Sequence, residues 1–535
     1  MRCRLSTVQG WLLLLLLAAL IPIYACYLLQ PAFGYFHDDG VYIVNALSLV
    51  SGSGYRTISL PNPLFQTKYP ILYPALLSLL WKVFPAFPQN VLAFKSLSLA
   101  SGWLWAGAAC IAIRRETAST AISRWSLVFT LAAPWTIFLS TSVLPDTLFA
   151  FLSVCAILIL SSHSDDYRSI GIAAVIAGCA FLLRSVGVAL ILAACLFLVQ
   201  KRRFRGAVLF LAVSGVLVLP WLIWQCTHAA STDSIESYYT KLSYAAGNVF
   251  RYPVSDALLA VGLNFSVMLG TICPVAGAPL LSLQTITNLV AGLLVVAALV
   301  TTWRWSLPVL WTFVYCVVLL CWVAPAPRYL TPVLPFAFML LFSAIEKLLA
   351  KAGTATVKRF LRVAALTTGL GCLIGNLAAL HYVTRLTIEN KTPSFSIANA
   401  DDWTRTLELA HWVQTRTPPN AIVAANSDPA FYLLTHRHTI RPFNSDPFQL
   451  FYDQRPAKKP LGGVDKLRVH LKNHQIGYIV ITPMSSYPEK ASFARQLLAL
   501  THAYPLAFRR EMQTSDPSYY ILKVNLHRLC ARPLY

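Results

Sequence analysis

Two adjacent carboxylates, Asp38 and Asp39, stand in the stretch FHDDGVYIVNAL, which directly follows a long apolar run. Ionisable residues at the edge of a membrane are costly to place and mark functional sites. A carboxylate there can take a proton from a hydroxyl group and act as a general base. A helix cap is an alternative role for Asp39. Capping needs one carboxylate, however, so the second acid and His37 beside it are left unexplained.

A cation follows the acids in the same loop. In LPNPLFQTKYPILYP, Lys68 and Tyr69 stand at the start of a second apolar segment. A lysine at this height can extend its ammonium to lipid headgroups. Because Lys68 shares its loop with the paired acids, the sequence favours an anion-binding role.

Further charges occur at the ends of later apolar runs. TSVLPDTLF places Asp146 at the mouth of one run, where it either caps the next helix or serves a site. FLLRSVG holds Arg184, and PRYLTPVLP holds Arg328 and Tyr329, although the latter stretch also fits a tight turn between two spans. Carboxylates with ammonium and guanidinium groups suit a reaction in which an acid takes a proton from a hydroxyl while cations hold a phosphate. The substrate would be a lipid phosphate at the outer leaflet.

The elements that position these residues are membrane helices. The chain of 535 residues is 57% hydrophobic and 12% charged, and apolar runs of about 17–25 residues are long enough to span a bilayer. The sequence predicts a polytopic α-helical membrane protein with about 11 crossings. They lie near 11–29, 91–113, 125–141, 147–161, 168–184, 186–200, 206–227, 283–302, 306–324, 330–349 and 361–382.

The basic loops set the orientation. The stretches 114–124, 201–205 and 351–362 are rich in Lys and Arg and fall on one side if the N-terminus is cytoplasmic. The C-terminus is then outside, together with the acidic loop. Two further apolar segments, 69–85 and 255–274, would disturb this pattern as spans, so we interpret both as helices at the outer interface.

The composition changes near residue 383. Helix-like DDWTRTLELAHWVQTR is followed by the short strand AIVAA and by DPAFYLLT, a helix that Asp428 is expected to cap. The segments 476–482 and 518–524 are predicted strands, with helical ASFARQLLAL between them. We therefore predict a transmembrane core at 1–382, with an external loop at 30–90, and an extracytoplasmic α/β domain at 383–535.

Charge and cysteine content exclude other classes. The formal net charge is +22, but many basic residues lie in short loops between apolar runs, so the charge indicates topology and not nucleic-acid binding. The 12 cysteines are scattered and form neither a CxxC pair nor a cluster with histidine. We expect no cofactor, and no metal is favoured at the paired acids, although a divalent ion is an alternative there.

These residues resemble the C-type integral-membrane glycosyltransferases, in the branch of the protein O-mannosyltransferases and the aminoarabinose transferase of lipid A. HDDGVYIVNAL is similar to the branch's acidic motif, an Asp-Glu pair followed by a tyrosine, here Tyr42. TKYPILYP resembles its Lys-Pro-Pro stretch. TSVLPDTLF, FLLRSVG, PRYLTPVLP and WVQTRTPPNAIVAANSDPAFYLLTHR resemble segments of the bacterial members, so the resemblance covers nearly the whole chain as an ordered series.

The resemblance implies an enzyme that moves a sugar from polyprenyl phosphate to a hydroxyl of a lipid, glycan or protein, with inversion. Asp38 would be the base, and Asp39, where the family has Glu, would orient the acceptor or the sugar. Lys68 would contact the donor phosphate, with Arg184 and Arg328 as further candidates. The remaining substrate-binding candidates are His37, Tyr42, Tyr69, Asp146 and Tyr329. The location expected is the bacterial inner membrane.

Two other functions stay open at this point. Many spans with intramembrane charges also occur in transporters and lipid flippases, but these commonly show paired repeats and broken helices near mid-membrane. A non-catalytic membrane scaffold that binds a partner through its exported domain is the third alternative.

Overall fold

The computed structural model describes residues 2–34, 36–228, 253–272, 305–322, 327–351, 354–357, 400–442, 463–482 and 490–530, with the single residues 239, 296, 298, 359 and 363. The chain divides into two compact units, each described by itself below. The helical unit takes Met1–Leu29, Leu92–Ile223 and Asn248–Arg385. The loop-and-sheet unit takes Gln30–Val91, Trp224–Gly247 and Leu386–Tyr535. The external loop that carries the paired acids thus belongs to the same compact unit as the C-terminal region.

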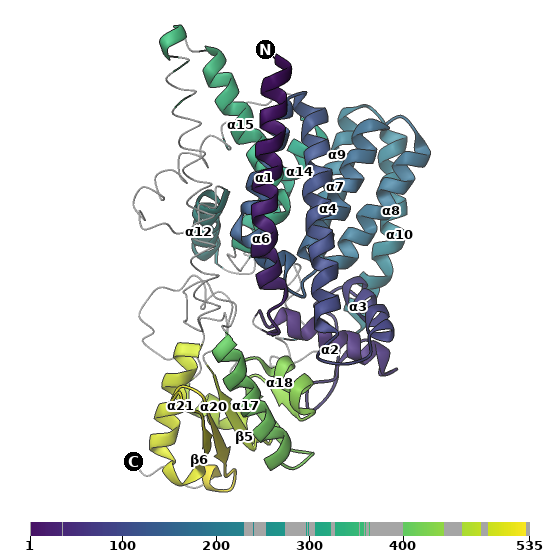
Figure 1. The fold of residues 1–535 in the computed structure, drawn as a ribbon. Helices are drawn as coiled ribbons and strands as arrows, with labels where there is room; N and C mark the ends of the chain where they lie inside the picture. Colours follow the sequence, from purple (N-terminus) through teal and green to yellow (C-terminus); the bar gives the residue numbers. More distant parts are fainter. Residues whose placement is uncertain are drawn as a thin grey trace. The chain divides into compact units, whose positions relative to one another are not determined.

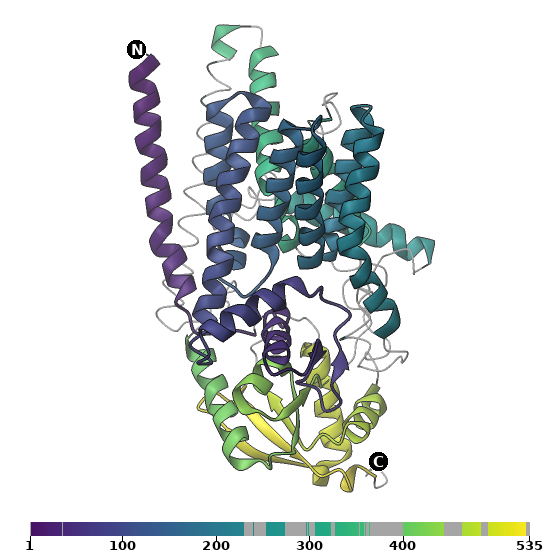
Figure 2. The ribbon, with the colours of Figure 1, turned by 90° about the vertical axis from the view of Figure 1, so that its right-hand side faces the viewer.

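The helical unit is made of apolar helices, most of which run alongside one another, while α12 lies across them (Figures 1 and 2). Helix α7 packs against α8, α9 against α14, and α5 against α15. The helices are α1 (Arg2–Leu28), α4 (Val91–Thr117), α5 (Thr120–Ala132), α6 (Pro134–Ser140), α7 (Asp146–Ser162), α8 (Tyr167–Leu183), α9 (Val188–Gln200), α10 (Phe204–His228), α12 (Val254–Ile272), α14 (Leu307–Leu320) and α15 (Leu334–Lys351). Two 3₁₀ turns, η1 (Ser185–Gly187) and η3 (Pro327–Val333), precede α9 and α15.

Three helices within the described ranges are long and apolar enough to cross a membrane, namely Val91–Thr117, Phe204–His228 and Arg328–Lys351. A bent pair formed by α5 and α6 would be a fourth. Shorter apolar helices, including α7, α8 and α14, accompany them. The protein is an integral multi-pass membrane protein. The count of eleven crossings stays a prediction, and the expected spans at 283–302 and 361–382 lie largely outside the described residues.

The expected single helix over 125–141 is two helices. Helices α5 and α6 meet at an angle of 64°, and Ala133 between them has an extended backbone. Pro134 explains the break, because proline has no N–H to continue the helix and disfavours helical geometry in the residue before it.

The loop-and-sheet unit begins with α2 (Asp38–Val50), the short antiparallel pair β1 (Arg56–Thr57) and β2 (Leu64–Phe65), and α3 (Leu72–Val83). The predicted helix at the paired acids is confirmed, with both acids in its first turn. It ends at a turn in which Gly52 and Gly54 have positive φ angles, a conformation that glycine adopts without strain.

The two segments predicted as interfacial are both helical. Helix α3 has 12 residues, which gives a length of about 18 Å against a hydrocarbon core of about 30 Å. It leaves Leu79 and Val83 exposed, and this apolar surface fits a helix lying at an interface. Helix α12 has 19 residues, and its relation to the membrane stays a prediction.

The C-terminal part of this unit is a mixed five-stranded sheet in the order β4-β3-β5-β7-β6. Strands β4, β3 and β5 are parallel, while β7 is antiparallel to both β5 and β6. Its elements are α17 (Ala400–Arg416), β3 (Ile422–Ala425), α18 (Asp428–Thr435), β4 (His438–Ile440), α20 (Gly463–Asn473), β5 (Tyr478–Ile481), α21 (Lys490–Ala503), η4 (Pro505–Ala507), β6 (Phe508–Gln513), β7 (Tyr520–Val524) and η5 (Arg528–Cys530). The strands and helices expected from the sequence are confirmed here.

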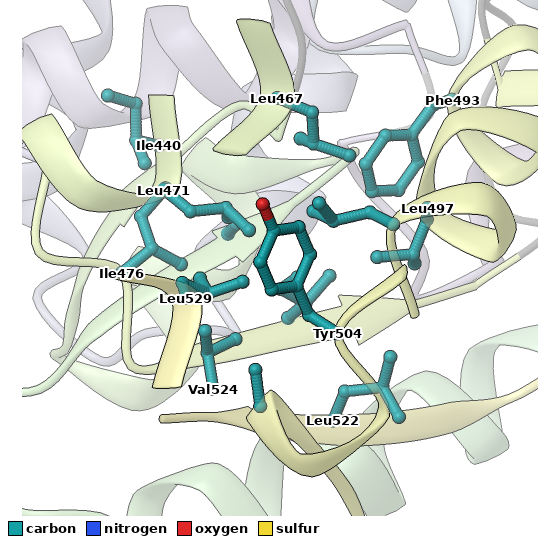
Figure 3. Packing of buried hydrophobic residues seen from close by; sticks show 14 of the residues in the cluster. Ile440, Leu467, Leu471, Ile476, Phe493, Leu497, Tyr504, Leu522, Val524 and Leu529 are labelled. Atoms are coloured by element: carbon teal, nitrogen blue, oxygen red, sulfur yellow. The ribbon is translucent and has the colours of Figure 1, made fainter. Parts of the chain in front are cut away.

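Helices cover both faces of the sheet. Successive side chains of each strand point to opposite faces, so each strand contributes to both layers of packing. On one face Ala424 and Ile479 pack with Leu471 of α20 and Leu497 of α21. Figure 3 shows Leu471 and Leu497 in this cluster. On the other face Val423 and Val480 pack with α17 and α18. This α/β core holds helix α18, whose first residues contact the acidic loop.

Candidate active site

The Asp38 carboxylate contacts one member of a cluster of tyrosines. Its Oδ1 accepts a hydrogen bond of 2.5 Å from the Tyr69 hydroxyl. Tyr42 lies one helical turn after Asp38 on the same face of α2, and its ring centroid is 5.0 Å from that of Tyr69 and 5.2 Å from that of Tyr73. Asp38 itself is half-buried. The structure thus brings three predicted site residues, Asp38, Tyr42 and Tyr69, into one cluster.

Lys68 lies beside this cluster, with its ammonium 4.9 Å from the centre of the Tyr69 ring. The backbone there is held by Gln66, whose Oε1 accepts from the N–H groups of Lys68 at 2.9 Å and of Tyr69 at 3.2 Å. Trp224 in turn donates to the Gln66 carbonyl at 3.0 Å, and Tyr55 donates to the Tyr69 carbonyl at 2.7 Å. Sequence analysis missed these supporting residues, because isolated Gln, Trp and Tyr side chains carry no recognisable motif.

The two neighbouring acids have different environments. Asp39 is 3% exposed, and its Oδ2 accepts a 2.7 Å hydrogen bond from the N–H of Gly34. Burial raises the pKa of the Asp39 carboxyl, against the hydrogen bonds from Gly34 and Gly40 that lower it. Asp38 is the more accessible carboxylate and meets a hydroxyl, so it is better placed to exchange a proton.

Gly34 fits its position for two reasons. Its φ angle is +82°, and a Cβ atom there would lie 2.5 Å from the Cβ of Ala430 in α18. We expect Gly34→Ala to destabilise the protein by about 2–4 kcal/mol, from backbone strain and overpacking together. Gly52→Ala is the matched control, because Gly52 has a φ of +73° with nothing within 4 Å, and strain alone predicts about 1 kcal/mol. If thermal unfolding showed the same loss of stability in Gly34→Ala and Gly52→Ala, close packing of Gly34 against Ala430 would be contradicted.

His37 and Asp428 form a buried pair. The His37 Nε2 lies 2.8 Å from Asp428 Oδ1, and the Tyr239 hydroxyl donates to Asp428 Oδ2 at 2.8 Å. The expectation that Asp428 caps its helix is wrong. Ser427 holds the cap position and makes no side-chain capping bond, while the Asp428 carboxylate bonds to these two distant residues instead. No local pattern in the sequence could have indicated a partner 391 residues away.

A second group forms within the helical unit. Arg184 makes an ion pair with Asp146, with side chains 15% and 1% exposed. The ring of Tyr329 lies 5.3 Å from the guanidinium carbon of Arg184 and 5.1 Å from that of Arg328. Asp146 is the first residue of α7, but Pro145 occupies the cap position. The Asp146 carboxylate therefore does not cap the helix and instead pairs with Arg184. Four predicted residues from three separate segments therefore lie together.

The described part of the chain contains no group of three or more His, Cys, Asp or Glu side chains arranged to hold a metal ion. Within that part, the Tyr69 hydroxyl donates to Asp38, and the Lys68 ammonium lies over the ring of the same tyrosine. This arrangement is suited to proton transfer and anion binding.

No protein-family model matches the sequence, and no curated protein matches it. Solved structures do match the fold. The structure of ArnT from Cupriavidus metallidurans bound to undecaprenyl phosphate aligns with a TM-score of 0.55 at 15% identity, over 96% of this chain and 98% of that one. Its apo form gives 0.55 at 14% identity, over 98% and 99% of the two chains. The Archaeoglobus fulgidus oligosaccharyltransferase tethered to an acceptor peptide gives 0.53 at 14% identity, over 94% and 74%.

These matches define the class of fold. The chain has the fold of the C-type integral-membrane glycosyltransferases, as represented by the aminoarabinose transferase ArnT and the archaeal oligosaccharyltransferase AglB. The structural resemblance expected from the short motifs is confirmed.

Proposed function

We propose that the protein is a glycosyltransferase that moves a sugar from a polyprenyl-phosphate donor to an acceptor hydroxyl, with inversion at the anomeric carbon. The observation that carries the proposal is the half-buried Asp38 carboxylate beside Lys68 and Tyr69, in a chain with the fold of ArnT, a protein solved with undecaprenyl phosphate. The acceptor is a lipid, glycan or protein. The reaction takes place at the outer face of a bacterial inner membrane, and the C-terminal domain is extracytoplasmic.

Asp38 acts as the general base in this proposal. It stands in the first turn of α2, at the end of the helix that carries partial positive charge. The carboxylate takes the proton of the acceptor hydroxyl as the acceptor oxygen attacks the anomeric carbon. The bond from that carbon to the phosphate oxygen breaks, and polyprenyl phosphate leaves with the electron pair.

The cations stabilise the leaving phosphate. Lys68 is the first candidate, since it lies beside the Asp38 cluster. Arg328 and Arg184 follow, and both guanidinium groups lie near the Tyr329 ring. A planar guanidinium can bind two phosphate oxygens at once. The Asp146 carboxylate and the Tyr329 ring would then orient these arginines.

The other predicted residues support the base. Tyr69 donates to the Asp38 carboxylate and offers an aromatic surface to the sugar, while buried Tyr42 packs against the Tyr69 ring. Asp39 and His37, both buried, hold the backbone that precedes Asp38. These two residues therefore act on the shape of the loop instead of on the substrate.

Lys68→Met should raise the KM for the donor by about 10- to 100-fold, because the variant loses a charge-assisted contact to phosphate. Lys68→Arg should recover part of the loss. Lys82→Met is the matched control, since Lys82 is an exposed lysine in the last turn of α3. Steady-state kinetics at varied donor concentration measure the effect, and an unchanged KM in Lys68→Met would remove Lys68 from the phosphate site.

Proteoliposomes distinguish the transferase from a transporter or flippase. A labelled polyprenyl-phosphate sugar and an acceptor extract are supplied on the side of the C-terminal domain. Appearance of glycosylated product with release of polyprenyl phosphate supports the transferase. Movement of intact donor across the bilayer, without glycosylated product, would contradict it.

A further inference from the structure

The first external loop is joined to the C-terminal domain at several points within one compact unit. The ring of Phe33 contacts that of Trp403 in α17, with centroids 5.2 Å apart. The N–H of Thr439 in β4 donates to the carbonyl of Ser59 at 2.8 Å. Gly40 directly follows the paired acids, and a Cβ atom at this position would lie only 3.1 Å from the side chain of Pro429. The loop that carries Asp38 is therefore built onto the domain's surface.

A buried polar network lies at the centre of this contact. Asp428 accepts from Tyr239 on one carboxylate oxygen and meets His37 on the other. Tyr239 also accepts a 3.1 Å hydrogen bond from the N–H of Arg441, and the Thr439 hydroxyl donates to the Asp428 carbonyl at 2.7 Å. All these side chains are buried. A buried carboxylate is costly unless it is paired, and here its partners come from two other segments of the chain.

The backbone of His37 is strained. Its φ angle is +60° and its ψ angle is −49°, a combination that residues other than glycine adopt only at a cost. The His37 ring, 2% exposed, lies against Asp428. The carbonyl of His37 also accepts the hydrogen bond from Val41 that opens α2. Whatever holds His37 thus determines the direction of the first turn and of Asp38.

We propose that Asp428 of the C-terminal domain is a positioning residue for the base Asp38, and that it acts through His37. This inference rests on the proposed function. The exported domain is then part of the catalytic unit, since it supplies the carboxylate that fixes the acidic loop. Asp428 does not touch the substrate. It orders the loop so that Asp38 reaches the acceptor hydroxyl.

A double-mutant cycle on transfer kinetics tests the link. His37→Asn suits it, because the shorter side chain removes the imidazole that meets Asp428 and stays polar, and Asp428→Asn keeps the shape of the carboxylate. Each variant should lower kcat by about 10- to 100-fold, as misplacing a catalytic group by about 1 Å does, with little change in the donor KM. The double variant should lose no more than either single one, because both remove the same link.

The matched control is Asp516→Asn, which removes a carboxylate that pairs with Arg405 at 3.3 Å in the same domain. It should lower thermal stability without lowering kcat per folded molecule. The proposal would be overturned if the kcat losses of His37→Asn and Asp428→Asn added up in the double variant. An unchanged kcat in Asp428→Asn would also overturn it. If Asp428→Asn does not fold, Tyr239→Phe removes one hydroxyl only, and its kcat should fall several-fold.

Hydrogen exchange separates this inference from the proposed function, because it needs no substrate. In His37→Asn and Asp428→Asn, the amides of 36–50 should exchange faster, while those of β5 and β7 keep their protection. Unchanged exchange over 36–50 would overturn the link even if transfer is lost. If exchange over 36–50 is faster in these variants but the wild type transfers no sugar, the link between Asp428 and the acidic loop is supported and the transferase is rejected.

Discussion

Asp38→Asn lowers the rate of sugar transfer by about 10²- to 10⁴-fold, the usual contribution of a positioned general base. The amide cannot take the acceptor proton, yet it has the same shape as the carboxylate and can still accept the hydrogen bond from the Tyr69 hydroxyl. Folding and membrane insertion should therefore be unchanged. The measurement is kcat in detergent, normalised to protein that elutes as a single species.

Tyr69→Phe is the companion variant. It removes the hydroxyl that donates a hydrogen bond to Asp38 but leaves the Asp38 carboxylate in place. We therefore expect a smaller loss in the rate of transfer, of about tenfold or less. A loss in Tyr69→Phe as large as that in Asp38→Asn would make the tyrosine the essential group. Normal transfer by Asp38→Asn would exclude Asp38 as the base.

Arg184→Ala destabilises the protein by about 3–5 kcal/mol, because it leaves the carboxylate of Asp146 buried without its partner. The Asp146 side chain is 1% exposed with Arg184 in place. The paired change Asp146→Asn with Arg184→Met should recover most of the stability, since neither residue is then charged. Thermal unfolding in one detergent measures all the variants.

The same variants separate two roles of Arg184. If Arg184→Ala is as stable as the wild type but has a raised donor KM, the guanidinium binds phosphate and the ion pair contributes little. If the double variant is stable and transfers sugar normally, Arg184 is structural, and Arg328 is left as the arginine for the phosphate.

Much of the fold could be predicted because its signals are local. The start of α2 at the paired acids, the strands β3, β5 and β7, and helices α17 and α21 each follow from periodicity and nearby turn residues. The break at Pro134 was also present in the sequence, but a long apolar run concealed it. The sequence placed Asp146, Arg184 and Tyr329 only at the ends of separate apolar runs and did not indicate that they meet.

The remaining features depend on distant contacts. No spacing rule pairs His37 with Asp428, and the division of labour between Asp38 and Asp39 depends on burial that only packing determines. The reason for glycine at positions 34 and 40 is visible only in the structure, because α18 packs against both. In the sequence, a glycine next to a pair of acids suggests a turn, whereas in the structure Gly40 leaves space for α18.

The most direct test of the proposed transferase is the release of free polyprenyl phosphate when purified protein is incubated with a panel of labelled polyprenyl-phosphate sugars. An acceptor extract is supplied, and Asp38→Asn is assayed in parallel. The wild type should consume at least one donor, and Asp38→Asn should consume it at least about 100 times more slowly. Equal release by the two proteins, or no release with any donor by protein shown to bind polyprenyl phosphate, would contradict the proposal.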